Sequence, residues 1–510
     1  MHKTIEIWYK SFDMSGLNEL LNQAMFENLE REQLMSFLLT VAIERNKLIE
    51  QNKLLEQKVI ELTKKIEELE GRLSLDCTNS HKPSSSDPYS KPAPKSQRKK
   101  SGKTPGGQFK HKGHGKSMAD KVTETKVITP KACSCCGENL QNVTEHKTDT
   151  HYVMEMPPIE VTVTKYVREK KTCPACGKKV SLDFPPEAQA TQQYGPNLKA
   201  LMVLLAEVGM VAMGRIVEIV KAVSGIKVSC GTVVNTIEKC AKHLENPVKS
   251  IKEAVKEAKV VHFDETGMRS QGGLKWLHTA STEKLTYLAI NKKRGKDAMD
   301  EIGIINTIKN IAVHDCLKSY FNYNCVHSLC NAHLLRDLTF IDQRTGQSWA
   351  KEMIDLLIEI KKAVELRRLE GKTSLADGEL SNYTQRYNML VEGGLIINPE
   401  QAKPKGKRGP AKQTKARLLL LRLQERKNEY LRFATDFIVP FDNNQAERDF
   451  RMAKVKQKVS GCFRSDEGGK SFATIYSFIQ TLKKNGVTVF DELVKVFKGN
   501  YSFPFHLATE

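Results

Sequence analysis

Apolar residues recur every seven positions in the first part of the chain, and this spacing predicts a coiled-coil helix. We expect one long helix over residues 17–75 whose d positions are Val41, Leu48, Leu55, Leu62 and Leu69. The corresponding a positions are Leu38, Arg45, Asn52, Val59, Ile66 and Leu73. A single Asn at an a position, with Leu at the later d positions, favours a parallel dimer in one register. The pattern therefore predicts a homodimer, and a helix packed against its own protein is the alternative.

A helical period returns over residues 190–258, where we expect a helical domain. The stretches with this period are PNLKALMVLLAEVG, GRIVEIVKAVSG and SCGTVVNTIEKCAKHL. The turn GIKVS joins the last two and resembles that of a helix-turn-helix, in which the second helix enters a DNA groove. Because residues 232–239 carry little positive charge, plain helical packing is the alternative.

From residue 259 the period becomes that of strands. The segment KVVHFDETGMRS contains a short apolar strand that ends in Asp264, and NIAVHDCLKSYF contains another that ends in Asp315. Between them we expect two hairpin strands, in GLKWLHTAST and KLTYLAINKKRG, and a helix around Ala298 to Ile304. Two separate strands thus each place one aspartate at the same relative position.

A strongly basic helix follows within residues 439–465. It comes after three favourable N-cap residues, Asp442, Asn443 and Asn444. We expect the helix over Gln445–Lys458, with Ser460 and Gly461 stopping it, so that Glu447 lies in its first turn. Basic residues at spacings of three and four form a cationic stripe beside this carboxylate: Arg448, Arg451, Lys454 and Lys458. A solvated face is the alternative interpretation of the stripe.

Positive charge is gathered in three segments of this 510-residue chain, whose formal net charge is +20. Residues 82–116 hold ten basic side chains and one acidic one, residues 403–417 hold seven and none, and residues 448–464 hold six and one. Such clusters indicate a nucleic-acid partner. Residues 77–120 are rich in Ser, Pro, Gly and Lys, so we expect a flexible basic linker, or else a solubilising tether. Its candidate DNA contacts are Arg98, Lys99 and Lys100.

The chain offers no membrane-spanning stretch by its apolar pattern. The longest apolar run, residues 200–214, is interrupted by Glu207 and is too short to span a bilayer. The opening residues MHKTIEIWYK lack the apolar core of a signal peptide. We therefore expect a cytoplasmic, nucleoid-associated protein of about three or four folded units, without a membrane partner.

Two cysteine pairs of the form CxxCG predict a zinc-binding domain over residues 121–185. They are separated by an alternating stretch, IEVTVTKYVREKK, which we expect to be a strand. Zn²⁺ takes four ligands in a tetrahedron, and two tight turns that each present two thiolates supply them. The candidate ligands are Cys133, Cys136, Cys173 and Cys176, and Cys135 is a candidate to replace a neighbour. A redox role for the two pairs is the alternative, but the surrounding βαβ pattern is absent from the sequence.

Asp264, Asp315 and Glu447 together are the set of carboxylates needed to hold two Mg²⁺ (or Mn²⁺) ions. In phosphoryl transfer such ions activate the attacking oxygen and stabilise the leaving one. Clustered carboxylates repel one another unless a cation lies among them. Taken singly, an aspartate after an apolar strand is more often a turn or cap residue.

Four segments resemble the DDE transposase of the insertion-sequence 66 family: VHFDET, VHDCLKSYF, LCNAHLLRDL and PFDNNQAERDFRMAKVKQKVSGCFRS. The similarity extends to KPSSSDPY, GGQFKHKGH, the paired cysteine turns and FATIYSFIQTLKKNG. It implies a multidomain α+β protein of a bacterium, in which an RNase H-like catalytic domain has a mixed sheet and flanking helices. This domain would span residues 259–339 and 437–497, with a helical insertion over 340–436, and would follow the coiled coil, the small zinc-binding domain and the helical domain. Its implied catalytic acids are Asp264, Asp315 and Glu447.

The segment LCNAHLLRDL places Cys330 and His333 three residues apart. Similar transposases carry a comparable Cys and His motif after the second aspartate, which implies that His333 assists near the scissile phosphate. A structural histidine beside a buried cysteine is the alternative. A second zinc site is a further, less favoured alternative, with the ligands Cys325, His327, Cys330 and His333.

These observations favour a DNA transposase that binds the terminal inverted repeats of an insertion sequence and catalyses metal-dependent strand cleavage and strand transfer. The alternative is a catalytically silent DNA-binding protein derived from a transposase, either a repressor or a domesticated protein, and the intact acids argue against it. A coiled-coil scaffold would not need acids at strand ends. The expected partners are double-stranded DNA, at the element ends and the target, and a second copy of the chain. Whether accessory proteins of the same element take part stays open.

Overall fold

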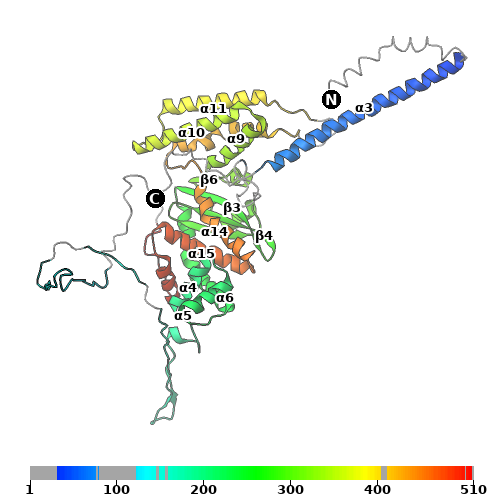
Figure 1. Ribbon diagram of the computed structural model, residues 1–510. Helices are drawn as coiled ribbons and strands as arrows, with labels where there is room; N and C mark the ends of the chain where they lie inside the picture. The colour runs from blue at the N-terminus through cyan, green and yellow to red at the C-terminus, as the bar shows by residue number, and fades with distance from the viewer. Residues whose placement is uncertain are drawn as a thin grey trace. The chain divides into compact units, whose positions relative to one another are not determined.

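The computed structural model of the chain describes residues 31–75, 79, 122–144, 149–155, 159–403, 411–499 and 501–507 (Figure 1). It divides into two compact units, Met1–Tyr89 and Ser90–Glu510. The predicted basic linker, with Arg98, Lys99 and Lys100, lies outside the described residues apart from residue 79. No helix in the described part of the chain is long and apolar enough to cross a membrane.

In the described part of the first unit, residues Arg31–Leu73 form one continuous helix, α3. The helix prediction is confirmed over this range, and residues 17–30 lie outside the described chain. Apolar side chains at the predicted seam, such as Leu48, Leu55 and Leu62, are more than half exposed. A second helix that covered these leucines would bury them and so stabilise the pair. The dimer itself stays a prediction.

A five-stranded mixed sheet lies at the centre of the second unit, in the order β5-β4-β3-β6-β7. Its strands are β3 (Val260–Ser270), β4 (Gly273–Ser281), β5 (Thr286–Asn291), β6 (Ile311–His314) and β7 (Val326–Leu329). The first three form an antiparallel meander, whereas β6 and β7 run parallel to β3. The predicted hairpin strands and the strand before Asp315 are therefore confirmed.

The prediction that the first strand ends at Asp264 was wrong. β3 continues to Ser270, because its pairing with β4 extends as far as Ser270 opposite Gly273. Its parallel pairing with β6 stops at His262, opposite Val313. The strand therefore has one neighbour fewer from Phe263 onward, and it continues as one arm of a hairpin.

Helices cover the sheet and share its apolar core. α4 (Pro196–Glu207), α5 (Met213–Ser224) and α6 (Cys230–His243) confirm the three helices expected over residues 190–258, and α7 (Glu245–Lys256) follows them. Their apolar faces contribute to one cluster with residues of the sheet and of two later helices, α15 (Asp466–Lys484) and α16 (Val489–Lys498). Between β5 and β6, α8 (Lys296–Ile302) forms near the expected position.

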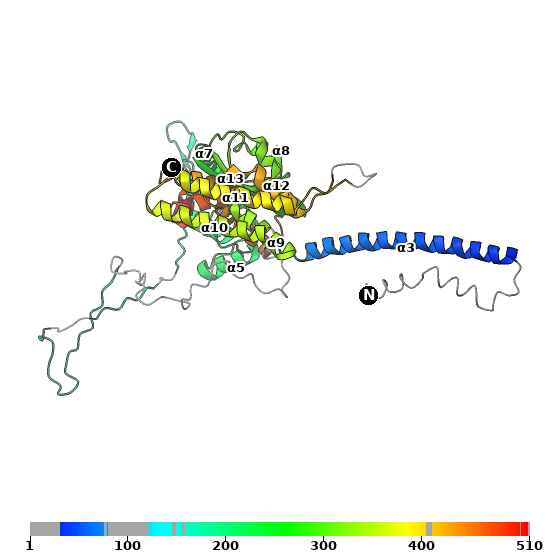
Figure 2. The same cartoon turned by 90° about the horizontal axis from the view of Figure 1, so that it is seen from above.

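A helical segment connects β7 to the basic helix α14 (Asn444–Ser460). It comprises α9 (Asn331–Thr345), α10 (Ser348–Leu369), α11 (Asp377–Ile397), α12 (Lys415–Glu425) and α13 (Lys427–Thr435). α10 and α11 pack side by side (Figure 2). The two ends of the segment meet, since the Asn331 N–H donates to the Phe441 carbonyl at 3.1 Å. The chain thereby returns to the sheet directly before α14.

The strand predicted in IEVTVTKYVREKK does not form over the described residues 159–170. Short strands β1 (Lys171–Thr172) and β2 (Lys179–Val180) pair only around the second cysteine turn. Val163 and Val167 remain exposed, at 88% and 72%. An alternating pattern predicts a strand only where a neighbouring strand and a core accept it, and this segment packs on neither within the described chain.

Candidate functional site

The two candidate aspartates lie at the same level of two neighbouring strands, just beyond the end of the parallel pairing of β3 and β6. Asp264 and Asp315 each lie two residues beyond the last parallel pair of their strands, His262 opposite Val313. β3 and β6 are neighbours, so their two carboxyl groups are brought close together. Glu447 approaches from the first turn of α14, which packs against β3 and β4. The fold therefore gathers the three acids predicted from the sequence.

The electrostatics of Asp264 reflect this gathering. Its pKa is raised well above the usual value, first by burial and then by the carboxylates of Glu265, Asp315 and Glu447. A backbone hydrogen bond from the Glu265 N–H acts in the opposite direction. A cluster of carboxylate oxygens that oppose one another's ionisation is the chemical environment that a hard divalent cation stabilises.

The acids do not form a closed metal site by themselves. Within the described residues, no three side chains of His, Cys, Asp or Glu lie close enough together to hold one metal ion. This holds for the acids and for the two cysteine turns alike. The donor types fit Mg²⁺ at the acids and Zn²⁺ at the turns, and closure of either site requires side chains to move toward the ion.

His333 lies beside the third acid. It is in the first turn of α9, and its Nε2 atom is 3.7 Å from the Glu447 Oε1 atom. The structure thus brings together the four residues that the sequence singled out for catalysis. This proximity is suited to an exchange of protons near Glu447, while the role of His333 stays a prediction.

The N-terminus of α14 is fastened by a contact that the sequence did not reveal. Asn443 is at the N-cap position as predicted, but its side chain makes no capping hydrogen bond. Its amide donates to the Phe263 carbonyl at 2.7 Å, and its Oδ1 atom lies 2.8 Å from Nδ1 of His262. Its backbone N–H donates to the Cys330 sulfur at 3.1 Å. Fully buried, Asn443 therefore ties the helix of Glu447 to the strand of Asp264 and to the start of α9.

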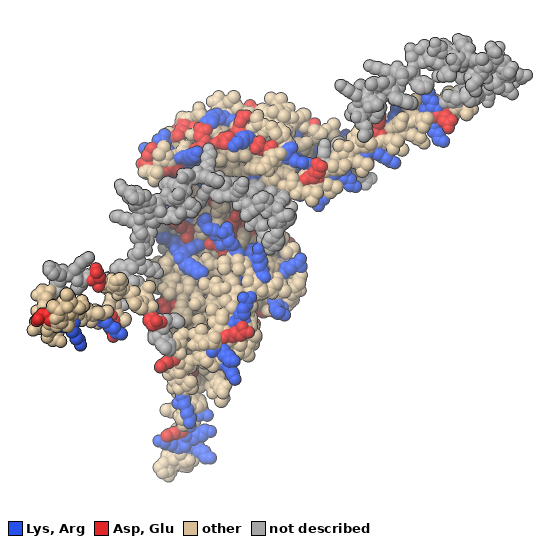
Figure 3. All heavy atoms as spheres, in the orientation of Figure 1, with Lys and Arg blue, Asp and Glu red and all other residues tan. Residues whose placement is uncertain are grey.

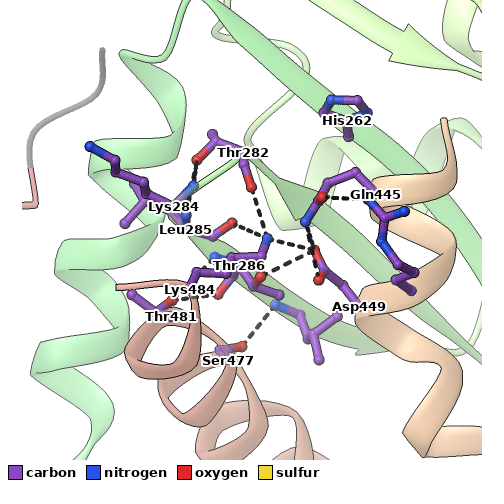
Figure 4. Close-up of polar contacts among 12 residues, drawn as sticks. His262, Thr282, Lys284, Leu285, Thr286, Gln445, Asp449, Ser477, Thr481 and Lys484 are labelled. Atoms are coloured by element: carbon purple, nitrogen blue, oxygen red, sulfur yellow. Dashed lines mark hydrogen bonds and ion pairs between the residues drawn. The ribbon is translucent and has the colours of Figure 1, made fainter. Parts of the chain in front are cut away.

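A buried ion pair fastens the next turn of α14 (Figure 4). The Lys484 ammonium of α15 donates to Asp449 Oδ2 at 2.7 Å, and also to the carbonyls of Thr282 and Leu285. The hydroxyl of Thr286, on the edge strand β5, donates to the same Asp449 oxygen at 3.1 Å. The carboxylate two residues after Glu447 is thus anchored to both β5 and α15.

The predicted cationic stripe is only partly a free surface. Arg448, Arg451 and Lys458 are exposed, whereas the half-buried Lys454 donates to the carbonyl of Gly267 on β3. Burial lowers the pKa of Lys454. Lys and Arg side chains gather over the sheet and α14 on the face seen in Figure 3. This face is suited to a polyanion.

The two cysteine turns have the same local geometry. In each, a glycine at positive φ, Gly137 or Gly177, donates its N–H to the carbonyl of the first cysteine, at 3.0 and 2.9 Å. Backbone N–H groups two and three positions further along lower the pKa of the first cysteine in each turn: those of Cys135 and Cys136 act on Cys133, and those of Cys176 and Ala175 act on Cys173. Each turn is therefore shaped to present thiolates. Cys135 is exposed, so the exact ligand set stays open.

The less favoured second zinc site does not form in the described chain. Cys330 accepts a hydrogen bond from Asn443, and His333 faces Glu447. His327 instead contacts the buried His314: the His327 Nδ1 atom is 2.9 Å from the His314 Nε2 atom. Cys325 also lies beside His327. The four proposed ligands thus belong to two separate groups.

Three matches to known families cover most of the chain. A family described as "Transposase IS66 family" matches residues 191–471, more than half of the sequence. A family described as "zinc-finger binding domain of transposase IS66" matches residues 130–177, and a family of unknown function, DUF6444, matches residues 28–117. No curated protein matches the chain.

Proposed function

The chain belongs to the IS66 transposase family, and we propose that it binds the terminal inverted repeats of an insertion sequence and catalyses metal-dependent strand cleavage and strand transfer. The observation that carries this proposal is that Asp264, Asp315 and Glu447 come together where the parallel pairing of β3 and β6 ends. The sheet order β5-β4-β3-β6-β7, with a meander followed by two parallel strands, supports an RNase H-like catalytic domain.

The roles of the residues follow from their chemistry. Asp264, Asp315 and Glu447 would hold Mg²⁺ or Mn²⁺ through carboxylate oxygens. When bound, such ions activate the attacking oxygen and stabilise the leaving oxygen of an in-line displacement. Asn443 orients the first turn of α14 against β3, and His333 would exchange a proton near the scissile phosphate. Exposed arginines of α14 would neutralise neighbouring DNA phosphates.

The proposal is tested by an end-cleavage assay. Purified protein is incubated with Mg²⁺ and duplexes that carry the ends of the element that encodes it, and new 3′ hydroxyl ends and joined products are measured. We expect cleavage with Mg²⁺ or Mn²⁺ and none in EDTA. Sequence-specific binding without cleavage under every metal condition would instead identify a catalytically silent DNA-binding protein.

The coiled coil is proposed to join two protomers so that each engages one element end. Changing Leu55 and Leu62 on α3 to glutamine removes two d residues and should convert the dimer to a monomer in light scattering. The matched control changes Leu54 and Ile60, which are equally exposed but lie off the seam. We expect the control to stay dimeric, and a d-position variant of unchanged dimer mass would place the seam elsewhere.

Zinc is proposed to be held by Cys133, Cys136, Cys173 and Cys176. Elemental analysis should find about one zinc per chain. The content should fall when Cys173 and Cys176 are changed to serine, because two of four thiolates are lost. Cys230→Ser is the control, since this exposed cysteine lies on α6. Full zinc content in the double variant would show that the ligands are other residues.

A further inference from the structure

A buried carboxylate adjoins the candidate acids without being one of the predicted ligands. This residue is Glu265, which directly follows Asp264, and its side chain has no exposed surface. It accepts hydrogen bonds from Arg294 Nε at 2.8 Å and from the Tyr320 hydroxyl at 2.6 Å. The Arg294 Nη2 atom is also 2.8 Å from the same Glu265 oxygen. A carboxylate buried in this way is costly to desolvate, and pairing it with a cation is seldom more stabilising than well-packed apolar residues, so its presence calls for a reason other than stability.

The arginine of this pair extends toward the candidate acids. Its Nη2 atom is 3.8 Å from Asp315 Oδ2. The guanidinium lies over the Trp276 ring, 4.9 Å from the ring centroid, and 41% of the side chain is exposed. The contacts to Glu265 use the Nε and Nη2 groups, so Nη1 is not engaged by that carboxylate. The Arg294 guanidinium is therefore fixed by Glu265 through Nε and Nη2, while another part of the side chain is open to solvent.

We propose that Arg294 is a DNA contact of the catalytic site, whose guanidinium binds a phosphate of the strand being cut while Glu265 and Trp276 hold it in place. The inference rests on the proposed transposase function. Guanidinium groups bind phosphate with a planar fork of N–H donors, and a fork fixed beforehand loses little entropy on binding. A fixed cation beside Asp315 also stabilises negative charge that develops on the phosphate.

A purely structural role makes a different prediction. If Arg294 serves only to neutralise Glu265, removing both charges together should restore a normal enzyme, because no uncompensated buried charge remains. If Arg294 binds DNA, the double change should restore folding but not activity. The neutral pair Arg294→Met with Glu265→Gln therefore separates the two roles.

The experiment measures end cleavage, thermal unfolding and DNA binding for this double variant. We expect an unfolding midpoint near that of the wild type and cleavage reduced on the order of 100-fold. Binding of a short fluorescent duplex in Ca²⁺ should lose about one unit of its salt slope, as expected for one phosphate contact. Wild-type cleavage and an unchanged slope would overturn the proposal.

Two further variants keep the test decisive. Arg294→Lys preserves a charge for Glu265 but lacks the planar fork with which a guanidinium binds the carboxylate on one side and a phosphate on another, so it should fold and still lose cleavage about tenfold or more. An Arg294→Lys protein that cleaves at the wild-type rate would also contradict the proposal. The matched control is Arg386→Met with Glu359→Gln, an ion pair beside the ring of Tyr383 in the helical segment, which should cleave normally. Absence of cleavage by the wild type would instead reject the transposase function itself.

Discussion

Changing Glu447 to glutamine is expected to abolish strand cleavage and joining while DNA affinity stays near that of the wild type. The substitution keeps the shape of the side chain and removes the negative charge that a divalent cation requires. Loss of one metal-binding carboxylate should lower the cleavage rate on the order of 1,000-fold. The measurement is the end-cleavage assay beside an equilibrium binding assay in Ca²⁺.

Glu467→Gln is the matched control for this prediction. Glu467 is an exposed acid in the first turn of α15, the position that Glu447 has in α14, and its carboxylate lies 4.0 Å from the Lys470 ammonium. We expect it to cleave at the wild-type rate. A Glu447→Gln protein that cleaves at that rate would show that another acid, such as Glu265 or Asp442, completes the catalytic set.

The second large effect is expected at the anchor of α14. Lys484→Met leaves the Asp449 carboxylate buried without its cation, which should lower the free energy of unfolding by about 3–5 kcal/mol. Adding Asp449→Leu removes the unpaired charge, so the double variant should regain most of that loss. Denaturant unfolding, followed by circular dichroism, measures both changes.

An exposed ion pair provides the comparison. Lys351 and Asp355 on α10 lie 2.9 Å apart with 55% and 63% of their side chains exposed. Lys351→Met should change the free energy of unfolding by about 0–1 kcal/mol, because water screens the pair. If Lys484→Met were equally mild, the contacts around Asp449 could not be what holds α14 in place.

The sequence predicted the elements that carry the three candidate acids because their signals are local. Apolar runs before Asp264 and Asp315 indicate strands, and the N-cap residues before Glu447 indicate a helix start, so the acids could be named from neighbouring residues. That the acids meet depends on strand order, which follows from packing between distant segments. The resemblance to a family, rather than the pattern itself, supplied that step.

The contacts that sequence reasoning missed join residues far apart in the chain. Asn443 bonds to His262, 181 positions away, and Arg294 to Glu265, 29 positions away. An Asn before a helix and an Arg after a strand have common local roles, capping and solvation, so nothing in their neighbourhoods pointed to a partner. The strand expected in IEVTVTKYVREKK is the opposite case. Its alternating pattern is strong, but no described strand lies beside it to pair with it.

The most direct test of the shared acid site uses iron as the probe. Fe²⁺ is added in place of Mg²⁺ with ascorbate and peroxide, and the hydroxyl radicals formed at the bound ion cut the backbone around it. We predict that fragments map to three places far apart in sequence, near Asp264, Asp315 and Glu447, and that excess Mg²⁺ suppresses all three together. Cuts near only one of these residues, or cuts that Mg²⁺ leaves unchanged, would contradict a common metal site.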